Sequence, residues 1–133
     1  MGNPKAMQRP RFNAVTRTVY DNQKNERLIL GITLQKQHDR NPLLTGPLRL
    51  YATFYMPMPL RAPISQDLKP HYYKPDLDNL LKMLCDISNS IIFKDDCLIC
   101  EMHAKKLYSV NPRTEFYFEE INVKKDKDKI FSF

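Results

Sequence analysis

The chain has 133 residues and a mass of 15.7 kDa, a length typical of one domain. Hydrophobic residues make up 42% of it, enough for a core, and no run approaches the roughly 18 apolar residues of a membrane span. These values exclude general disorder and a membrane helix, and the start has no apolar signal region, so we expect a soluble cytoplasmic protein.

The charge is unevenly distributed along the chain. The net charge of +6 at pH 7 suits a polyanionic partner such as nucleic acid. Residues 1–75 contain twelve Lys or Arg and four acids, a balance of +8, whereas residues 76–133 contain nine basic and eleven acidic residues, a balance of −2. Five of those acids are aspartates within residues 76–96. Because carboxylates repel phosphate, we expect a divalent cation between the two.

The N-terminal segment, residues 2–17, is predicted to be an extended basic arm. Pro4 and Pro10 discourage a helix there. Apolar residues recur at helical spacing from about residue 20 to 37, which predicts a helix, although Gly31 weakens the pattern.

A strand is predicted at residues 48–56, because apolar and polar positions alternate there. One face of this strand would be buried and consists of Leu48, Leu50, Ala52, Phe54 and Met56. Residues 57–75 contain five prolines and no periodicity, which predicts a long loop. Long structureless loops in compact domains are often functional.

A second helix is predicted from Asp76 or Asp78, either of which can serve as its N-cap, to about Ser90. Its leucines and isoleucines recur every three or four residues, as one buried face requires. Residues 97–109 and 113–123 favour strands and are separated by a turn signal, which predicts a hairpin.

Together these elements predict an α+β fold. We expect a single compact domain with a small mixed β-sheet, two main helices and a C-terminal β-hairpin. The domain is expected to span residues 1–123, and residues 124–133, in which Lys and Asp alternate, are expected to form a charged tail.

The aspartates of residues 76–96 are the main candidate site. Asp76 and Asp78 lie at the junction of loop and helix, where both carboxylates can turn toward one point. Lys82 follows one helical turn after Asp78, and Asp95 and Asp96 come after the helix. Mg²⁺ prefers such oxygen ligands, and a bound ion would polarise a phosphate and activate water. The pattern therefore suits phosphodiester cleavage, with Lys82 steadying charge at the phosphate.

Each of these residues also has a simpler explanation. Aspartate is favoured at helix N-termini for capping and for the helix dipole. Asp78 and Lys82 have the spacing of an ordinary surface ion pair, and Asp95-Asp96 can form a turn. The residues by themselves leave a metal site and purely structural aspartates both open.

The order of the residues resembles the signature of the RusA family of Holliday junction resolvases. Residues 74–82 have the sequence Lys-Pro-Asp-Leu-Asp-Asn-Leu-Leu-Lys, and Lys-Asp-Asp follows at 94–96. The segments 2–4 and 9–12 resemble the family's proline- and arginine-containing start. The resemblance covers most of the chain, to about Val123.

This resemblance implies a small homodimeric endonuclease that uses Mg²⁺, with Mn²⁺ as a substitute. Such enzymes make paired nicks across four-way DNA junctions in recombination and repair, and are bacterial or prophage-encoded. Asp76, Asp78 and Asp96 match the family's catalytic, metal-binding aspartates, and Lys82 matches its essential lysine. Asp95 matches the neighbouring acid, and we include it among the metal ligands.

DNA contacts are expected on the arm and the long loop, because lysine and arginine side chains bind phosphates there. Lys74 aligns near a basic residue that lies close to DNA in the family. The candidate DNA-binding residues are Lys5, Arg9, Arg11, Lys69 and Lys74.

Two features depart from the family pattern. Members usually have a short strand ahead of the segment at residues 2–4, so either the start is truncated or the sheet lacks an edge strand. The basic run before the aspartates is reduced to Lys69, His71 and Lys74, which leaves junction selectivity open. The intervening pair at residues 72–73, both tyrosines, either stacks on opened bases or anchors the loop.

The favoured interpretation is a Mg²⁺-dependent, structure-selective endodeoxyribonuclease. Because one site cuts one strand, resolution of a junction requires a symmetric dimer. The alternative is a non-catalytic junction-binding protein whose aspartates are structural.

Overall fold

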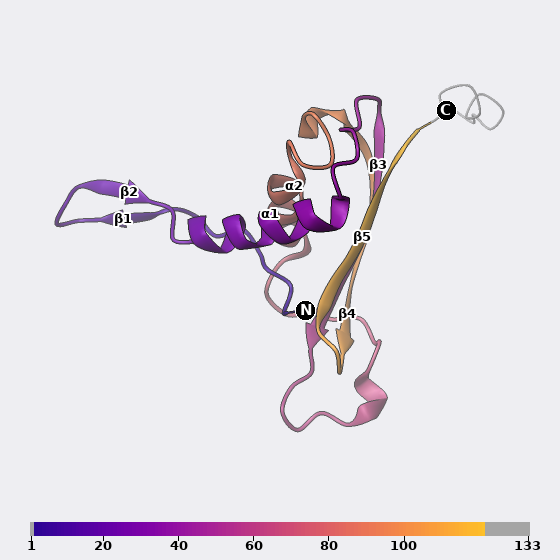
Figure 1. Cartoon of the computed structure of the whole chain (residues 1–133). Coiled ribbons are helices and arrows are strands. Elements are labelled where there is room, and N and C mark those ends of the chain that lie inside the picture. The colour runs from indigo at the N-terminus through magenta and orange to yellow at the C-terminus, as the bar shows by residue number, and fades with distance from the viewer. Residues whose placement is uncertain (1, 122–133) are drawn as a thin grey trace, which may run out of the picture.

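Two helices pack on one face of a three-stranded mixed sheet in the computed structural model, which describes residues 2–121 (Figure 1). The predicted α+β class, with one domain, two helices and a mixed sheet, is confirmed. Two short 3-10 turns occupy Ile64–Gln66 and Asp96–Leu98. The remaining elements are β1 (Arg11–Asn13), β2 (Thr18–Tyr20), α1 (Lys24–His38), β3 (Leu48–Pro57), α2 (Leu77–Ser88), β4 (Ile99–Ser109) and β5 (Arg113–Glu120).

β3 is the central strand of the sheet, whose strand order is β4-β3-β5. It runs parallel to β4, with Phe54 opposite Lys106, and antiparallel to β5. Parallel neighbours need a crossover connection, which residues 58–98 provide with α2 inside it. The crossover brings the segment just before α2 against Lys106 of β4.

The predicted C-terminal hairpin is wrong. β4 and β5 pair with opposite edges of β3 and not with each other. The connection at residues 110–112 therefore crosses two strand spacings, about 9.6 Å, which four Cα–Cα steps can reach. Strand propensity and a short connector are the same for a hairpin and for this arrangement, so the local sequence could not distinguish them.

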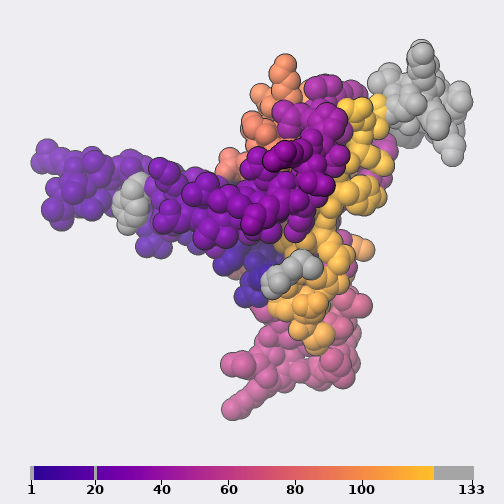
Figure 2. All heavy atoms as spheres, in the orientation of Figure 1, coloured from indigo at the N-terminus to yellow at the C-terminus, as the bar shows by residue number. Residues whose placement is uncertain are grey.

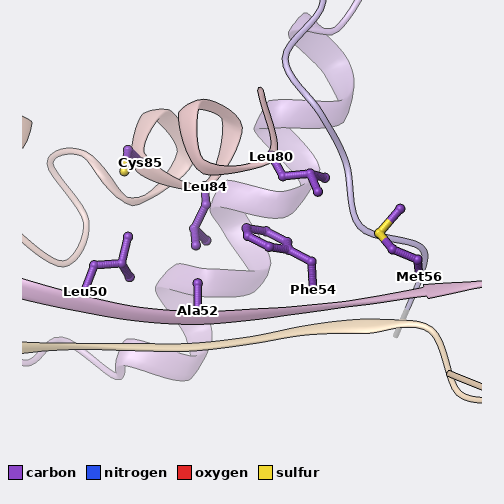
Figure 3. Packing of buried hydrophobic residues seen from close by; sticks show 7 residues of the cluster. All are labelled: Leu50, Ala52, Phe54, Met56, Leu80, Leu84 and Cys85. Atoms are coloured by element: carbon purple, nitrogen blue, oxygen red, sulfur yellow. The ribbon is translucent and has the colours of Figure 1, made fainter. Parts of the chain in front are cut away.

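The predicted buried face of β3 is confirmed. The inward side chains of β3 are at most 4% exposed. Figure 3 shows Leu80 and Leu84 of α2 above Phe54 and Ala52 of β3. Burial of a Leu or Phe side chain stabilises a fold by about 1.5–3 kcal/mol, so this layer holds α2 to the sheet.

α1 confirms the helix predicted for residues 20–37, although none of its residues is buried. Leu28, Ile29 and Ile32 are 62%, 64% and 47% exposed. An apolar cavity of about 590 Å³ lies between α1, α2 and the inner face of the sheet. Arg27 connects the two helices, because its guanidinium lies 3.3 Å from the Asp86 carboxylate.

The N-terminal arm is more structured than predicted. Residues 2–10 have no regular secondary structure, but β1 and β2 pair as an antiparallel hairpin. Asn13 Oδ1 accepts hydrogen bonds from the amides of Val15 and Thr16, which stabilises the turn. In Figure 2 this hairpin projects from the body of the molecule. Strands of three residues are too short for periodicity to detect.

The predicted charged tail, residues 124–133, lies outside the described residues, so the tail and the domain boundary at residue 123 stay predictions. Among residues 2–121, no helix has the length and apolar character needed to cross a bilayer.

Replacement of Phe54 by Ala should lower the free energy of unfolding by about 3–5 kcal/mol, because the ring is fully buried between β3 and α2. Urea denaturation followed by circular dichroism measures this change. Leu60→Ala is the control, since Leu60 is fully exposed. Equal effects of the two substitutions would contradict the assigned core.

Candidate metal and DNA site

The candidate aspartates come before, within and after α2 in the chain. Asp76 is the N-cap residue, Asp78 lies in the first helical turn, and Asp96 begins the 3-10 turn before β4. Burial raises the pKa of the Cys85 thiol to about 11, and the Asp96 carboxylate adds to this effect.

Asp76 is bound by a lysine and does not cap the helix. Its side chain makes no capping hydrogen bond. Lys74 Nζ donates to both of its carboxylate oxygens, at 2.8 and 3.0 Å. The Lys74 hydrogen bond holds the pKa of Asp76 below its usual range and raises the pKa of Lys74. The capping explanation for Asp76 is therefore not supported, and its carboxylate is held in the charged form that binds cations.

Asp78 and Lys82 face solvent on the same side of α2. The Lys82 ammonium lies 4.0 Å from the Asp78 carboxylate, and the two side chains are 65% and 70% exposed. An exposed pair of this kind contributes little to stability. Both groups are therefore accessible to a ligand at the surface.

Asp95 has a structural contact. Its Oδ1 accepts a hydrogen bond from the Cys97 amide at 2.9 Å and caps the turn that Asp96 begins. This backbone hydrogen bond lowers the pKa of Asp95. Asp95 thus fixes the backbone that carries Asp96.

Lys106 is the residue of this site that the sequence did not reveal. Its Nζ donates to the carbonyl oxygens of Tyr73 and Pro75, at 2.5 and 2.6 Å, and its charge lowers the pKa of Asp76. The pKa of Lys106 is lowered in turn, mainly by burial. The sequence did contain a signal, because Lys106 follows Met102 and Ala104 at alternate positions of the predicted strand. The structure places it opposite Phe54, on the core side of the sheet. A lysine on the core side needs a hydrogen-bonding or charged partner, because burial of an unpaired ammonium group is unfavourable.

The expected DNA-binding residues lie on two separate elements. Arg9 and Arg11 are exposed on the arm, and Lys69 is exposed on the loop between β3 and α2. The other two are already paired with acids: Lys5 lies 3.0 Å from the Glu26 carboxylate, and Lys74 contacts Asp76. Lys74 is nevertheless 85% exposed, so a phosphate could replace its partner.

The two tyrosines of the loop do not anchor it through burial. Tyr72 and Tyr73 are 74% and 61% exposed, and their rings stack on each other with centroids 4.6 Å apart. The loop is instead attached by backbone hydrogen bonds from Leu68 and His71 to β4. Exposed, stacked rings are suited to base stacking.

The donor chemistry of the site fits a hard divalent cation, but the ligands are not gathered. Asp76, Asp78 and Asp96 offer only carboxylate oxygens, the ligands that Mg²⁺ prefers. Among residues 2–121, no three His, Cys, Asp or Glu side chains lie close enough together to hold a metal ion. The structure places Asp76 and Asp78 two residues apart at the start of α2, and Asp96 at the start of the 3-10 turn before β4.

Comparisons with known proteins point to one nuclease family. The family described as Endodeoxyribonuclease RusA matches residues 1–118, a range that includes every candidate site residue. The protein YqaN of Bacillus subtilis (strain 168), described as uncharacterized, is 30% identical over 132 residues. That alignment covers 91% of this chain and 93% of YqaN.

The contact of Asp95 predicts different outcomes for two substitutions. Asp95→Ala should speed hydrogen exchange of the Cys97 amide several-fold, because the amide loses its acceptor. Asp95→Asn should leave the exchange near the wild-type rate, since an amide oxygen can accept the same bond. Exchange measured by NMR tests this, and equal rates in all three proteins would show that Asp95 does not cap the turn.

Proposed function

The chain belongs to the RusA family of endodeoxyribonucleases, and we propose that it resolves four-way (Holliday) DNA junctions by paired, Mg²⁺-dependent cleavage of phosphodiester bonds. The observation that carries this proposal is the set of exposed aspartates at the start of α2 and on the 3-10 turn before β4, within the range that the family matches. Resolution of such junctions belongs to DNA recombination and repair.

Asp76, Asp78 and Asp96 would hold the cation, with Asp95 beside them. Mg²⁺, or Mn²⁺ in its place, supplies polarisation of the scissile phosphate and a lowered pKa of the attacking water when it is bound. Asp76 would exchange its lysine partner for the metal, which leaves the Lys74 ammonium available to a phosphate. Asp95 keeps the backbone of Asp96 in place through its bond to the Cys97 amide.

Lys82 would act on the phosphate and not as an anchor for DNA. Its ammonium is exposed and lies one helical turn from Asp78. A cation at this position stabilises charge that develops on the phosphate oxygens or on the leaving oxygen.

The arm and the loop would bind the sugar-phosphate backbone. Arg11 begins the hairpin that projects from the body in Figure 2, and Arg9 lies just before it, whereas Lys69 and Lys74 lie on the loop that leads into α2. The loop also carries the exposed Tyr72–Tyr73 stack, which suits opened bases. Contacts to phosphates make affinity fall steeply as salt rises.

A symmetric homodimer is part of the proposal, because two strands have to be cut at related positions. The apolar side chains exposed on α1 support an association of this kind: Leu28, Ile29 and Ile32.

One observation favours a second candidate function. Because no three potential ligands are gathered among residues 2–121, the chain could be a non-catalytic junction-binding protein with structural aspartates. A binding assay on a synthetic four-way junction, followed by a denaturing gel with and without Mg²⁺, separates the two functions. Binding without Mg²⁺-dependent nicks would favour the binder.

Asp78→Asn should abolish nicking of a four-way junction in Mg²⁺ and keep junction binding, because it removes a metal ligand and no phosphate contact. Gel shift and denaturing gels measure the two properties. Asp86→Asn is the matched control on the same helix, since Asp86 is paired with Arg27, and it should nick normally. Normal nicking by Asp78→Asn would rule out its assignment as a ligand.

Lys82→Ala should lower the nicking rate by about 100-fold with little change in junction affinity, because the lysine stabilises charge formed during cleavage. Single-turnover kinetics and gel shift measure these effects. Lys36→Ala, a loss of the same charge from the last turn of α1, is the control. A large loss of affinity in Lys82→Ala would instead make Lys82 a DNA anchor.

A further inference from the structure

The segment that leads into α2 lies along the free edge of β4. Backbone hydrogen bonds join Leu68 N to Tyr108 O (2.8 Å), Tyr108 N to Lys69 O (2.9 Å) and His71 N to Lys106 O (2.9 Å). The His71 ring packs on the Tyr108 ring, with centroids 4.7 Å apart. In the described chain no backbone hydrogen bond continues this pairing over residues 72–75, the last residues before Asp76.

The Lys106 side chain supplies the missing attachment. Its Nζ donates to the carbonyl oxygens of Tyr73 (2.5 Å) and Pro75 (2.6 Å), the residues on either side of Lys74. Hydrogen bonds from an ammonium group are roughly twice as strong as neutral ones. Two of its three N–H donors are used in this way, and the charge of the nearby Asp76 carboxylate raises the pKa of Lys106, against the larger lowering by burial.

We propose that Lys106 is a positioning residue of the nuclease site, which fixes the Tyr73–Pro75 turn and thereby directs the Asp76 carboxylate toward the metal. This inference rests on the proposed function, because it assigns Lys106 a role toward an ion that Asp76 holds. Lys106 does not touch that ion or the DNA. It acts through the backbone of residues 73–75 on the side chains that do.

A second explanation for an inward lysine on an edge strand is protection against pairing with another chain. Protection of the strand edge requires only a charge there, and it does not require the two hydrogen bonds that Lys106 donates to the Tyr73–Pro75 turn. The two explanations differ in the effect expected from losing the charge. Loss of a nearby positive charge alone would strengthen the binding of a divalent cation, whereas loss of positioning would weaken it.

The test compares Lys106→Met with Lys105→Met in the full chain, with Mn²⁺ affinity measured by calorimetry in the absence of DNA. Lys105 is the matched control, because it is exposed on the opposite face of the same strand, across from Thr53. We expect Lys106→Met to bind Mn²⁺ about tenfold more weakly than wild type. Lys105→Met should bind as wild type or slightly more tightly. Lys106→Arg, which keeps the charge and the donors, should restore most of the affinity.

Hydrogen exchange provides a readout that needs no metal. The hydrogen-bonded amides on either side of the turn are those of His71, which donates to Lys106 O, and Leu80, which donates to Asp76 O. Both should exchange faster in Lys106→Met than in wild type, and Lys105→Met should leave them unchanged. If wild type neither binds Mn²⁺ nor nicks a junction, the proposed function fails, whereas the exchange rates still report whether Lys106 holds the turn. The two failures are therefore distinguishable.

Unchanged or tighter Mn²⁺ binding by folded Lys106→Met would overturn the proposal, as would equal losses in Lys105→Met. If Lys106→Met does not fold, Lys106→Thr takes its place, because threonine suits a β-strand and its short side chain cannot reach the carbonyl oxygens of Tyr73 and Pro75. Wild-type Mn²⁺ affinity in Lys106→Thr, with unchanged amide exchange at His71 and Leu80, would also overturn the proposal.

Discussion

The packing of α2 on β3 decides where every candidate catalytic group lies. Phe54 and Ala52 of β3 meet Leu80 and Leu84 of α2, and this contact excludes water from the inner face of the sheet. Because those leucines occupy one face of the helix, Asp78 and Lys82 are directed to solvent on the other. The crossover then continues from α2 to the 3-10 turn that begins at Asp96, just before β4. The apolar layer between β3 and α2 thus fixes the helix that carries Asp78 and Lys82.

Neighbouring charged and hydrogen-bonding groups stabilise the ionised form of the carboxylates at this site. Asp76 is flanked by Lys74, which hydrogen-bonds both of its oxygens, and by Lys106, which holds the preceding turn. Two further aspartates of this segment also have specific partners: Asp86 has Arg27, and Asp95 has the Cys97 amide. These contacts compensate the negative charge of the carboxylates; in the proposed function, a bound cation would take this role at Asp76.

Local sequence predicted the elements whose periodicity is complete. The alternation of residues 48–56 and the three-and-four spacing after Asp76 gave β3 and α2 nearly to their ends. The strand order was not predictable in the same way, because pairing with β3 is decided by the crossover and not by strand propensity. Lys106 was missed for a related reason: its partners, Tyr73 and Pro75, are more than thirty residues away in the chain. The roles of the predicted site residues stay predictions, although the family match includes them all.

We propose that Asp76, Asp78 and Asp96, which do not form a gathered ligand set among residues 2–121, hold one divalent-metal centre when the ion is bound. A crystal structure of the protein with Mn²⁺ and a four-way junction, with the metal located by its anomalous scattering, tests this directly. We expect Mn²⁺ in inner-sphere contact with carboxylate oxygens of all three aspartates, with Lys74 released from Asp76 toward a phosphate. An anomalous peak that lies away from these aspartates, or an unchanged Lys74–Asp76 pair with the metal bound elsewhere, would contradict it.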